Sequence, residues 1–304
     1  GKTPPEFTAK ARQIDGKKWD VSDGGSVQNI VDGLRHVPFV VQNVHRREKK
    51  KYPVPPFITS KLQQDAARRF NFSVKKTMLL AQRLYEGIEV GREGSVGLIT
   101  YMRTDSSRVS ESALQEVRTL IARDFGREYL PNHPIYYKSK KTAQEAHEAI
   151  RPTSVERIPE SLKKDLEPEL WKLYSLIWNR FVASQMNPAL FDQTDVTIEA
   201  GDVEFKAIGS IEKFKGFLAV YQETRPDDGT DPRSIEADAI LPELAVGEIL
   251  DVKELVPAQH FTQPPSRYNE ASLVKALESK GIGRPSTYAS ILGTIQDRQY
   301  VEKQ

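Results

Sequence analysis

The sequence contains no cysteine in its 304 residues. This absence excludes disulfide bonds, thiolate metal sites and a cysteine nucleophile, and it agrees with a reducing cytoplasm, the location we expect. Long apolar runs are absent as well, since none approaches the roughly 20 residues that a membrane-spanning helix needs. A basic start followed by an apolar core is also missing, so we predict neither a signal peptide nor a membrane partner.

Net charge is nearly absent overall, at +2, but the two halves of the chain differ. Residues 1–151 carry 27 Lys and Arg against 17 Asp and Glu (+10), whereas residues 152–304 carry 17 against 25 (−8). A basic half favours a polyanionic partner, because each phosphate that is neutralised releases counterions. The alternative is an ordinary solvated surface, and the charge pattern by itself does not separate the two.

Two regions have the pattern of β-strands. Residues 1–57 contain short apolar runs separated by turn signals, namely Asp15-Gly16, Asp23-Gly24-Gly25 and Asp32-Gly33. From about residue 189 to 258 apolar and polar residues alternate, and Gly201-Asp202 can turn the chain back on itself. In this second region, Phe217–Tyr221 and Ile249–Val256 are predicted to be further strands.

Helical periodicity characterises the residues between these regions and those after 258. Capping residues or strong periodicity predict helices that start, in chain order, at Ser60 (with Gln63 as capping-box partner), Ser73, Ser110, Leu170, Asn269 and Pro285-Ser286. The most periodic of these helices contains Tyr174 and Trp178, which we interpret as core residues. A helical block thus lies between two strand-rich blocks in the sequence.

The simplest explanation of this order is an α+β multidomain fold with one domain inserted into another. We expect a discontinuous β-rich domain from residues 1–57 and 188–258, an inserted helical domain from 58–187, and part of a further helical domain from 259–304. The chain starts at Gly1 without an initiator Met and stops directly after an amphipathic stretch. We therefore interpret it as an internal piece of a longer protein.

The first candidate for chemistry is the segment Gly97–Ser106. In an extended chain Tyr101 and Arg103 share a face, with about 6–7 Å between residues two apart. A phenol has a pKa of about 10 and attacks phosphorus poorly unless a positive charge favours its ionised form. Arg103 can supply that charge and can bind phosphate oxygens in a bidentate way. The pair suits phosphoryl transfer onto tyrosine, although Tyr and Arg are also common on ordinary edge strands.

The second candidate is the segment Ala146–Pro152. His147 can hold a phosphate oxygen or move a proton near neutral pH. Arg151 lies four residues later, so the two side chains would align on a helix, although Pro152 makes Arg151 the end of any such helix. The alternative without a functional role is a polar turn with a surface histidine.

The third candidate is the segment Lys280–Tyr288. Its two glycines let the backbone approach a ligand closely, and Pro285 followed by Ser286 and Thr287 leaves amides and hydroxyls at a helix start, which is a ready phosphate site. Arg284 adds positive charge. The alternative is a plain connection between two helices with an ordinary cap.

Together these segments resemble the motifs of type IA DNA topoisomerases, in particular the bacterial DNA topoisomerase I group. Gly97–Ser106 is similar to the family's active-site motif, Ala146–Pro152 to its His motif, and Gly281–Tyr288 to its DNA-binding motif. Flanking similarity extends over most of the chain from about residue 50, including Pro56–Gln64 and Leu80–Gly87. In this comparison Ile88–Val96 resembles a longer variant of the loop before the tyrosine.

The resemblance implies a role for each motif. Tyr101 would attack single-stranded DNA and form a 5′-phosphotyrosyl bond, which frees a 3′-hydroxyl and conserves the energy needed for resealing without ATP. Arg103 and His147 would bind and polarise the scissile phosphate. The strand beside the cut would be held by Arg284, Ser286, Thr287 and Arg151. Passage of the intact strand through the gap would then relax negative supercoils.

The resemblance also implies a fold and a cofactor. The tyrosine would lie in a mostly helical domain carried on a β-rich arch, followed by part of a domain that grips single-stranded DNA, in a monomeric enzyme. The family uses Mg²⁺ held by an acidic domain nearer the N-terminus, and its Asp-x-Asp cluster is not found in this sequence. We therefore predict no metal ligand in this chain, and we expect it not to cleave DNA without that acidic domain of the same polypeptide.

Two alternatives remain from the sequence. The motifs are also compatible with topoisomerase III or with the topoisomerase region of reverse gyrase. From a different class, residues 269–298 could form a helix-turn-helix module that binds duplex DNA without catalysis.

Overall fold

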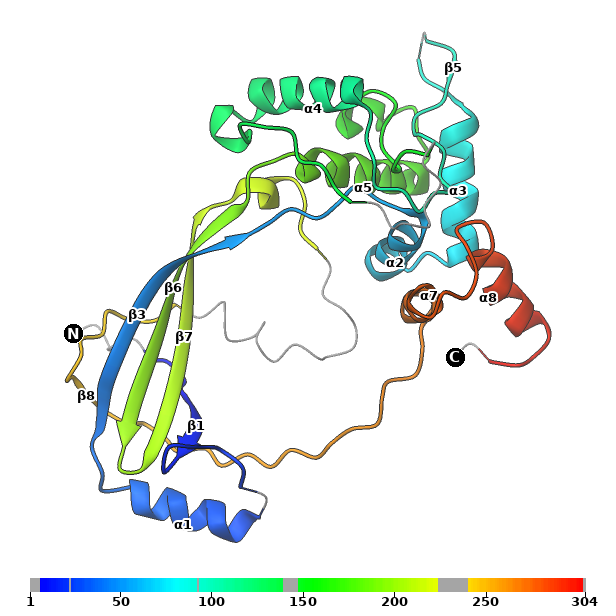
Figure 1. Ribbon diagram of the computed structural model, residues 1–304. Coiled ribbons are helices and arrows are strands. Elements are labelled where there is room, and N and C mark those ends of the chain that lie inside the picture. Colours follow the sequence, from blue (N-terminus) through cyan, green and yellow to red (C-terminus); the bar gives the residue numbers. More distant parts are fainter. Residues whose placement is uncertain (1–5, 22, 92, 139–146, 224–239, 303–304) are drawn as a thin grey trace. The chain divides into compact units, whose positions relative to one another are not determined.

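The computed structural model describes residues 6–21, 23–91, 93–138, 147–223 and 240–302. These residues form two compact units, which are drawn in Figure 1. The first unit contains the described residues of Gly1–Lys51, Ala189–Phe214 and Pro226–Ser266, and the second those of Tyr52–Pro188, Lys215–Arg225 and Arg267–Gln304. An antiparallel sheet dominates the first unit and helices dominate the second, which confirms the predicted α+β class.

The two compact units do not follow the bounds of the three expected domains in every segment. Lys215–Arg225, expected in the β-rich domain, groups with the helices of the second unit. Arg267–Gln304 groups with the same unit rather than standing apart. The assignment of residues 259–304 to a separate DNA-binding domain stays a prediction.

The first unit is built on a six-stranded antiparallel sheet with the strand order β2-β1-β7-β6-β3-β8. The strands are β1 (Lys10–Ile14), β2 (Lys17–Lys18), β3 (Phe39–Lys51), β6 (Ala189–Ala200), β7 (Val203–Phe214) and β8 (Ile249–Leu250). Asp15 and Gly16 both have positive φ, at 49° and 69°, as a two-residue hairpin turn between twisted strands requires. The predicted turns at Asp15-Gly16 and Gly201-Asp202 are therefore confirmed.

Other predictions for this unit are wrong. Helix α1 (Gly24–Leu34) includes the glycines that were interpreted as turns. Asp23 starts the helix because its carboxylate accepts a hydrogen bond from the Ser26 amide at 2.8 Å. The decisive signal is apolar spacing typical of a helix, at Val27, Ile30, Val31 and Leu34. Leu34 is buried in the core under the sheet, against strand residues such as Val41 and Val196.

Two segments that the sequence predicts to be strands are not strands over their predicted length. Most of Phe217–Tyr221 belongs to a 3₁₀ turn, η3 (Gly216–Ala219), in the second unit, where Phe217 is fully buried. Of Ile249–Val256, only Ile249–Leu250 pairs with β3. A short apolar run does not predict whether a sheet or helices will bury it, and Phe217 is buried in the helical unit.

The second unit consists mainly of helices. They are α2 (Thr59–Phe70), α3 (Val74–Glu86), α4 (Glu111–Asp124), α5 (Pro168–Ser184), α7 (Glu270–Ser279) and α8 (Tyr288–Asp297), with 3₁₀ turns η1 (Arg127–Tyr129) and η2 (Pro159–Leu162). A small hairpin of β4 (Ile88–Glu89) and β5 (Ser95–Val96) follows α3. The side chains of Ser73, Ser110 and Asn269 cap α3, α4 and α7 as predicted. No helix in the described part of the chain is long and apolar enough to cross a membrane.

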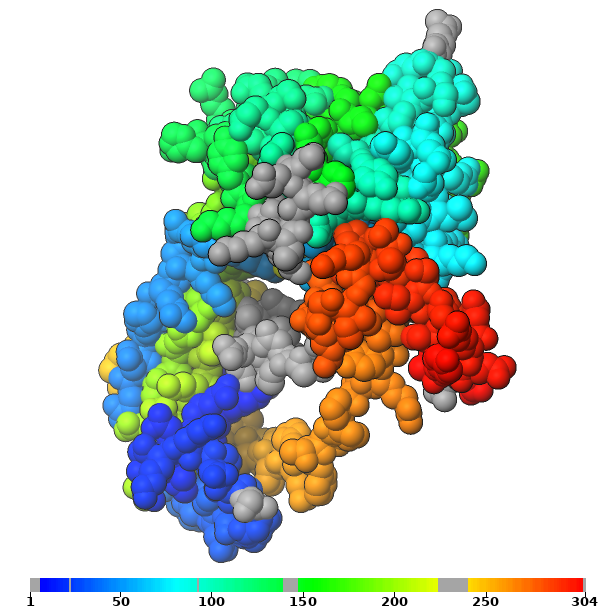
Figure 2. All heavy atoms as spheres, turned by 45° about the vertical axis from the view of Figure 1, so that its right-hand side comes forward, coloured from blue at the N-terminus to red at the C-terminus, as the bar shows by residue number. Residues whose placement is uncertain are grey.

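The core of this unit surrounds α5. Tyr174 is fully buried and Trp178 is 6% exposed, which confirms both as core residues, and each donates a hydrogen bond to a backbone carbonyl. Helices α7 and α8 pack on α2 and α3 (Figure 1), and Figure 2 shows orange and red residues against cyan ones. Val74, Val274, Tyr288 and Leu292 form the apolar centre of that contact.

Two predicted helix starts are displaced. The capping box of Ser60 and Gln63 does not form, because α2 already begins at Thr59 and the Ser60 hydroxyl is buried with no hydrogen-bond partner among the described residues. Helix α8 begins at Tyr288 rather than Pro285, since the amides of Thr287 and Tyr288 both donate to the Arg284 carbonyl in a preceding turn.

Candidate active site

The segment Gly97–Ser106 runs beside the segment of the His motif. Ile99 and Pro152 form an antiparallel bridge, and the Thr100 amide donates to the Arg151 carbonyl at 2.9 Å. The segment is not a regular strand, yet its side chains alternate as an extended chain requires. Tyr101 and Arg103 are exposed, whereas Met102 (0%) and Thr104 (1%) are buried. The prediction that Tyr101 and Arg103 share a face is therefore consistent with their exposure.

Tyr101 lies between two aromatic rings. Its ring centroid is 5.4 Å from that of Tyr85 on α3 and 5.9 Å from that of His147, and both contacts are edge-to-face. Tyr101 nevertheless remains 41% exposed. The fold thus brings the first two predicted motifs together. It also adds Tyr85, which the sequence analysis did not single out.

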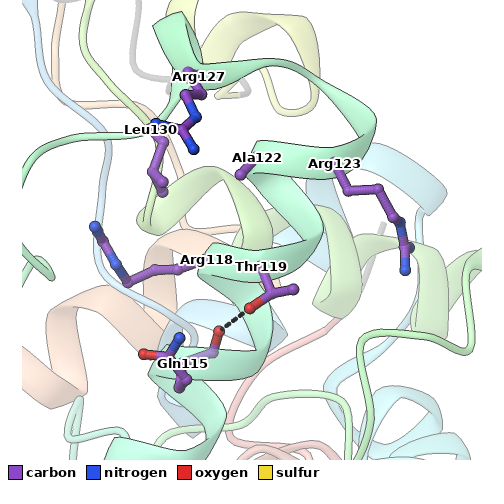
Figure 3. A pocket seen from close by; sticks show the side chains of 7 residues that line it. All are labelled: Gln115, Arg118, Thr119, Ala122, Arg123, Arg127 and Leu130. Carbon is purple, nitrogen blue, oxygen red and sulfur yellow. Dashed lines mark hydrogen bonds between the residues drawn. The ribbon is translucent and has the colours of Figure 1, made fainter.

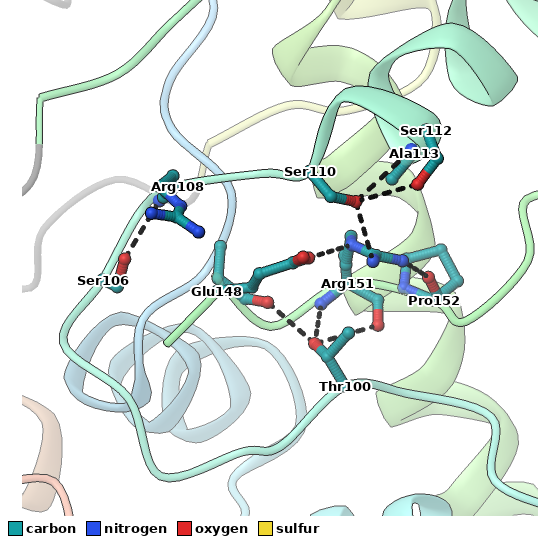
Figure 4. A network of polar contacts seen from close by, with 10 residues as sticks. Thr100, Ser106, Arg108, Ser110, Ser112, Ala113, Glu148, Arg151 and Pro152 are labelled. Carbon is teal, nitrogen blue, oxygen red and sulfur yellow. Dashed lines mark hydrogen bonds and ion pairs between the residues drawn. The ribbon is translucent and has the colours of Figure 1, made fainter. Parts of the chain in front are cut away.

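The Thr100 hydroxyl joins these two motifs, as Figure 4 shows. It donates to the Ala149 carbonyl at 2.7 Å and accepts from the Arg151 amide at 3.0 Å. Because Thr100 directly precedes Tyr101, and Ala149 lies two residues after His147, the hydroxyl fixes the two chain segments side by side. Thr100 is a second residue that sequence reasoning passed over, since a single threonine next to a motif carries no pattern of its own.

Arg151 is largely committed to protein groups. Its side chain is 12% exposed, its Nε lies 2.8 Å from a Glu148 carboxylate oxygen, and its Nη1 donates to the Pro152 carbonyl at 3.0 Å (Figure 4). The helical alignment considered for His147 and Arg151 does not occur, because residues 147–152 form no helix, and Ile150 and Pro152 are bridged to neighbouring segments. The role of Arg151 in binding DNA stays a prediction.

The third motif forms the turn between α7 and α8. The side chains of Arg284, Ser286 and Thr287 are exposed. The Thr287 hydroxyl accepts from the Arg284 amide at 2.8 Å, which holds the turn closed. Gly283 has φ +79°, and a Cβ there would lie 2.8 Å from the Ile291 side chain, so glycine is required at this position.

The pKa of Tyr288 depends on charged residues of both the third motif and the first. Tyr288, which follows the turn, has a raised pKa because burial disfavours its ionised form and the Glu278 carboxylate adds to this effect. The Asp105 carboxylate from the end of the Tyr101 segment raises the pKa of Tyr288 further, while Arg284 opposes the shift. Asp105 and Arg284 therefore both lie close enough to Tyr288 to act on it.

A separate hollow of about 560 Å³ lies on α4 and η1, lined by Gln115, Arg118, Thr119, Ala122, Arg123, Arg127 and Leu130 (Figure 3). None of the predicted site residues lines it. Arg118 donates to the Pro131 carbonyl at 2.9 Å, and Arg123 pairs with Asp124 and Glu156, so two of its three arginines already have protein partners. Within the described ranges, no group of three or more His, Asp or Glu side chains is placed to hold a metal ion.

Comparisons with known proteins agree with these motifs. A family model described as DNA topoisomerase matches residues 6–304. DNA topoisomerase 1 of Rickettsia bellii is 48% identical over 301 residues, which cover 97% of this chain and 37% of that protein. DNA topoisomerase 1 of Xylella fastidiosa is 48% identical over 311 residues, with the same two coverages of 97% and 37%.

A solved structure is also similar. The full-length topoisomerase I of Thermotoga maritima matches with a TM-score of 0.77 and 37% identity, over 97% of this chain and 46% of that one. The chain spans 37% of the length of the two curated relatives above.

Proposed function

Because this chain belongs to the DNA topoisomerase family, whose model matches residues 6–304, we propose that it supplies the cleavage tyrosine of a type IA enzyme. The observation that carries the proposal is the placement of Tyr101. Tyr101 is 41% exposed, its ring contacts His147, and Arg103, two residues along the segment, is exposed as well. A nucleophile and an imidazole are thus in contact, and a permanent cation is exposed two residues along the chain.

In the proposed reaction the Tyr101 phenol oxygen attacks a backbone phosphorus of single-stranded DNA. The new bond is a 5′-phosphotyrosyl ester, the bond from phosphorus to the 3′ oxygen breaks, and the phenol proton leaves while the 3′ oxygen gains one. Arg103 stabilises the charge on the phosphate oxygens and His147 holds one of them, contributions of about 3 kcal/mol each if they resemble other oxyanion clamps. Resealing reverses the same steps and needs no ATP.

We further propose that the third motif binds the strand next to the cut. Arg284 and Ser286 present exposed side chains for phosphate oxygens, whereas the Thr287 hydroxyl would have to share its contact with the Arg284 backbone. In the complete enzyme, passage of the intact strand through the gap then relaxes negative supercoils. Single-stranded DNA is the partner, and the active unit is a monomer.

Mg²⁺ enters this proposal only for the complete enzyme. The described residues offer no cluster of acidic or histidine side chains that fits the ion, so no step is assigned to a metal held by this chain. We expect its ligands in an acidic domain of the same polypeptide, and we expect this chain without that domain to leave DNA uncleaved.

The alternative of a duplex-binding helix-turn-helix module is less favoured by the packing. Tyr288 and Leu292, on the face of α8 toward α3, are buried against Val74 and Val274. Competition with random single-stranded DNA separates the two functions, because it would displace a labelled single strand from a topoisomerase but would not displace duplex DNA from such a module. Topoisomerase III and reverse gyrase remain alternatives within the class.

The test uses the Rickettsia bellii DNA topoisomerase 1 with this chain in place of its matching segment, here called the complete enzyme. A single-stranded oligonucleotide labelled at its 3′ end is incubated with the complete enzyme and Mg²⁺, and protein-bound label is measured after denaturation. We expect label on the unsubstituted enzyme and none on Tyr101→Phe, with the unmodified Rickettsia enzyme as positive control. Equal label on both variants would remove Tyr101 from the reaction.

A further inference from the structure

Thr59 is the first residue of α2, and it is completely buried. Its hydroxyl donates to the Met102 carbonyl at 2.7 Å, has the Thr104 carbonyl at 3.0 Å, and accepts from the Thr104 amide at 2.9 Å. The Thr59 amide in turn donates to the Thr104 carbonyl at 2.9 Å. One threonine thus satisfies backbone groups on both sides of Arg103.

These bonds explain why the Arg103 side chain points away from the core. A hydroxyl has one proton to donate and two lone pairs to accept with, and Thr59 uses both capacities on the residues that flank Arg103. Met102 and Thr104 are held inward, at 0% and 1% exposure, so the residue between them must point outward. The segment has no regular strand pairing of its own that would hold this geometry.

We propose that Thr59 is a positioning residue for strand cleavage and that it acts through Arg103. The hydroxyl holds Met102 and Thr104 so that the Arg103 guanidinium meets the scissile phosphate beside Tyr101. Thr59 does not itself contact DNA, because it has no exposed surface. This inference rests on the proposed function of Tyr101 and Arg103.

The expected effect follows from how steeply catalysis depends on placement. Thr59→Val keeps the branched shape and removes the hydroxyl, which leaves the buried Met102 carbonyl and Thr104 amide without this partner. The segment then shifts to find other partners, and a displacement of about 1 Å at a catalytic group costs on the order of 100-fold in rate. Binding of the DNA strand by the third motif is expected to be unchanged.

The experiment measures the single-turnover rate of covalent adduct formation by the complete enzyme at saturating oligonucleotide, together with the dissociation constant for that oligonucleotide. Thr59→Val is expected to lose on the order of 100-fold in rate with no change in binding, and Thr59→Ser, which keeps the hydroxyl, to recover most of it. Thr77→Val is the matched control. Thr77 is equally buried, but within the described residues its hydroxyl donates only to the carbonyl of Ser73, the cap of its own helix, at 3.0 Å.

A general loss of stability would lower the rates of both valine variants, so their equality would overturn the proposal. The path through Arg103 is tested by a double-mutant cycle, because two residues that act as a unit have non-additive effects. In an Arg103→Ala background, Thr59→Val is expected to have almost no further effect. A full additional loss in that background would show that Thr59 acts elsewhere.

The experiment distinguishes failure of the proposed function from failure of the proposed role of Thr59. If the unsubstituted complete enzyme forms no adduct on Tyr101, the proposed function fails. If it forms the adduct and Thr59→Val forms it equally fast, only the role of Thr59 fails. Should Thr59→Val not fold, Thr59→Ala, which leaves room for a bridging water, replaces it in the same comparisons with Thr59→Ser and Thr77→Val.

Discussion

Arg180 is a buried charged residue of the helical unit, and we expect its loss to be costly. Its side chain is 8% exposed, and its Nε donates to the Pro55 carbonyl at 2.6 Å while its Nη1 contacts the Tyr221 hydroxyl at 3.0 Å. The Asp65 carboxylate lies 4.0 Å away and also accepts a hydrogen bond from Tyr221. Arg180 thereby joins α5, the stretch before α2, and the segment after η3.

The perturbation is Arg180→Met, which keeps much of the volume and removes the charge. Removing one partner of a buried ion pair costs about 3–5 kcal/mol, because the other charge is left buried. Asp65 keeps Arg68 at 3.8 Å, so we expect the lower end, about 3 kcal/mol. For a unit of this size that corresponds to a fall in melting temperature of roughly 6–12 °C.

The assay is urea unfolding of this chain, followed by tryptophan fluorescence in a Trp19→Phe background. The remaining tryptophans, Trp171 and Trp178, are both on α5, so the signal reports the helical unit alone. Arg157→Met is the control, because Arg157 pairs with Glu93, which is 55% exposed, and such surface pairs contribute about 0.2–1 kcal/mol. A loss for Arg180→Met no larger than that of Arg157→Met would refute the reasoning.

Three further predictions concern stability. Burial raises the pKa of Tyr221 to about 12, and the Asp65 carboxylate adds to this shift while Arg180 opposes it. The neutral phenol therefore stabilises the fold below about pH 10, and this contribution is lost as pH rises toward 12. Unfolding curves across that range should therefore show a smaller loss of stability for Tyr221→Phe than for the unsubstituted chain, and equal slopes would contradict the assignment. Gly216 has φ +48° and a Cβ there would lie 2.4 Å from the Pro188 carbonyl oxygen, so Gly216→Ala should destabilise the chain by about 3 kcal/mol or more. Gly33→Ala, in open space within α1, should instead stabilise it by about 0.5–1 kcal/mol, and thermal melts showing the same sign for both alanines would be inconsistent with this account.

Much of the secondary structure followed from local physics. The helices capped by Ser73, Ser110 and Asn269 begin where predicted, because a cap needs only the next three residues of chain. The hairpin at Gly201-Asp202 also depends on neighbouring residues alone. The prediction failed where a local signal had two meanings, as at Asp23-Gly24-Gly25, where an aspartate before glycines is compatible with a turn and with a helix cap.

The start of α2 shows a second kind of failure. The capping-box spacing of Ser60 and Gln63 predicted a helix start at Ser60. The structure uses Thr59 instead, because its hydroxyl meets the buried backbone of Met102 and Thr104. The start of the helix therefore depends on residues more than 40 positions away in the sequence, and no local pattern predicts it.

The sequence alone determined which residue types could carry the reaction, namely a tyrosine two residues from an arginine, a histidine motif and a glycine-rich turn. It also determined most helix caps and the α+β class, because these depend on short-range spacing and composition. Only the tertiary structure decided that His147 and Tyr85 lie against Tyr101, and that Thr59 bonds the backbone on both sides of Arg103. The physical reason is that such contacts depend on the burial of distant segments against each other, which the spacing of residues along the chain does not encode.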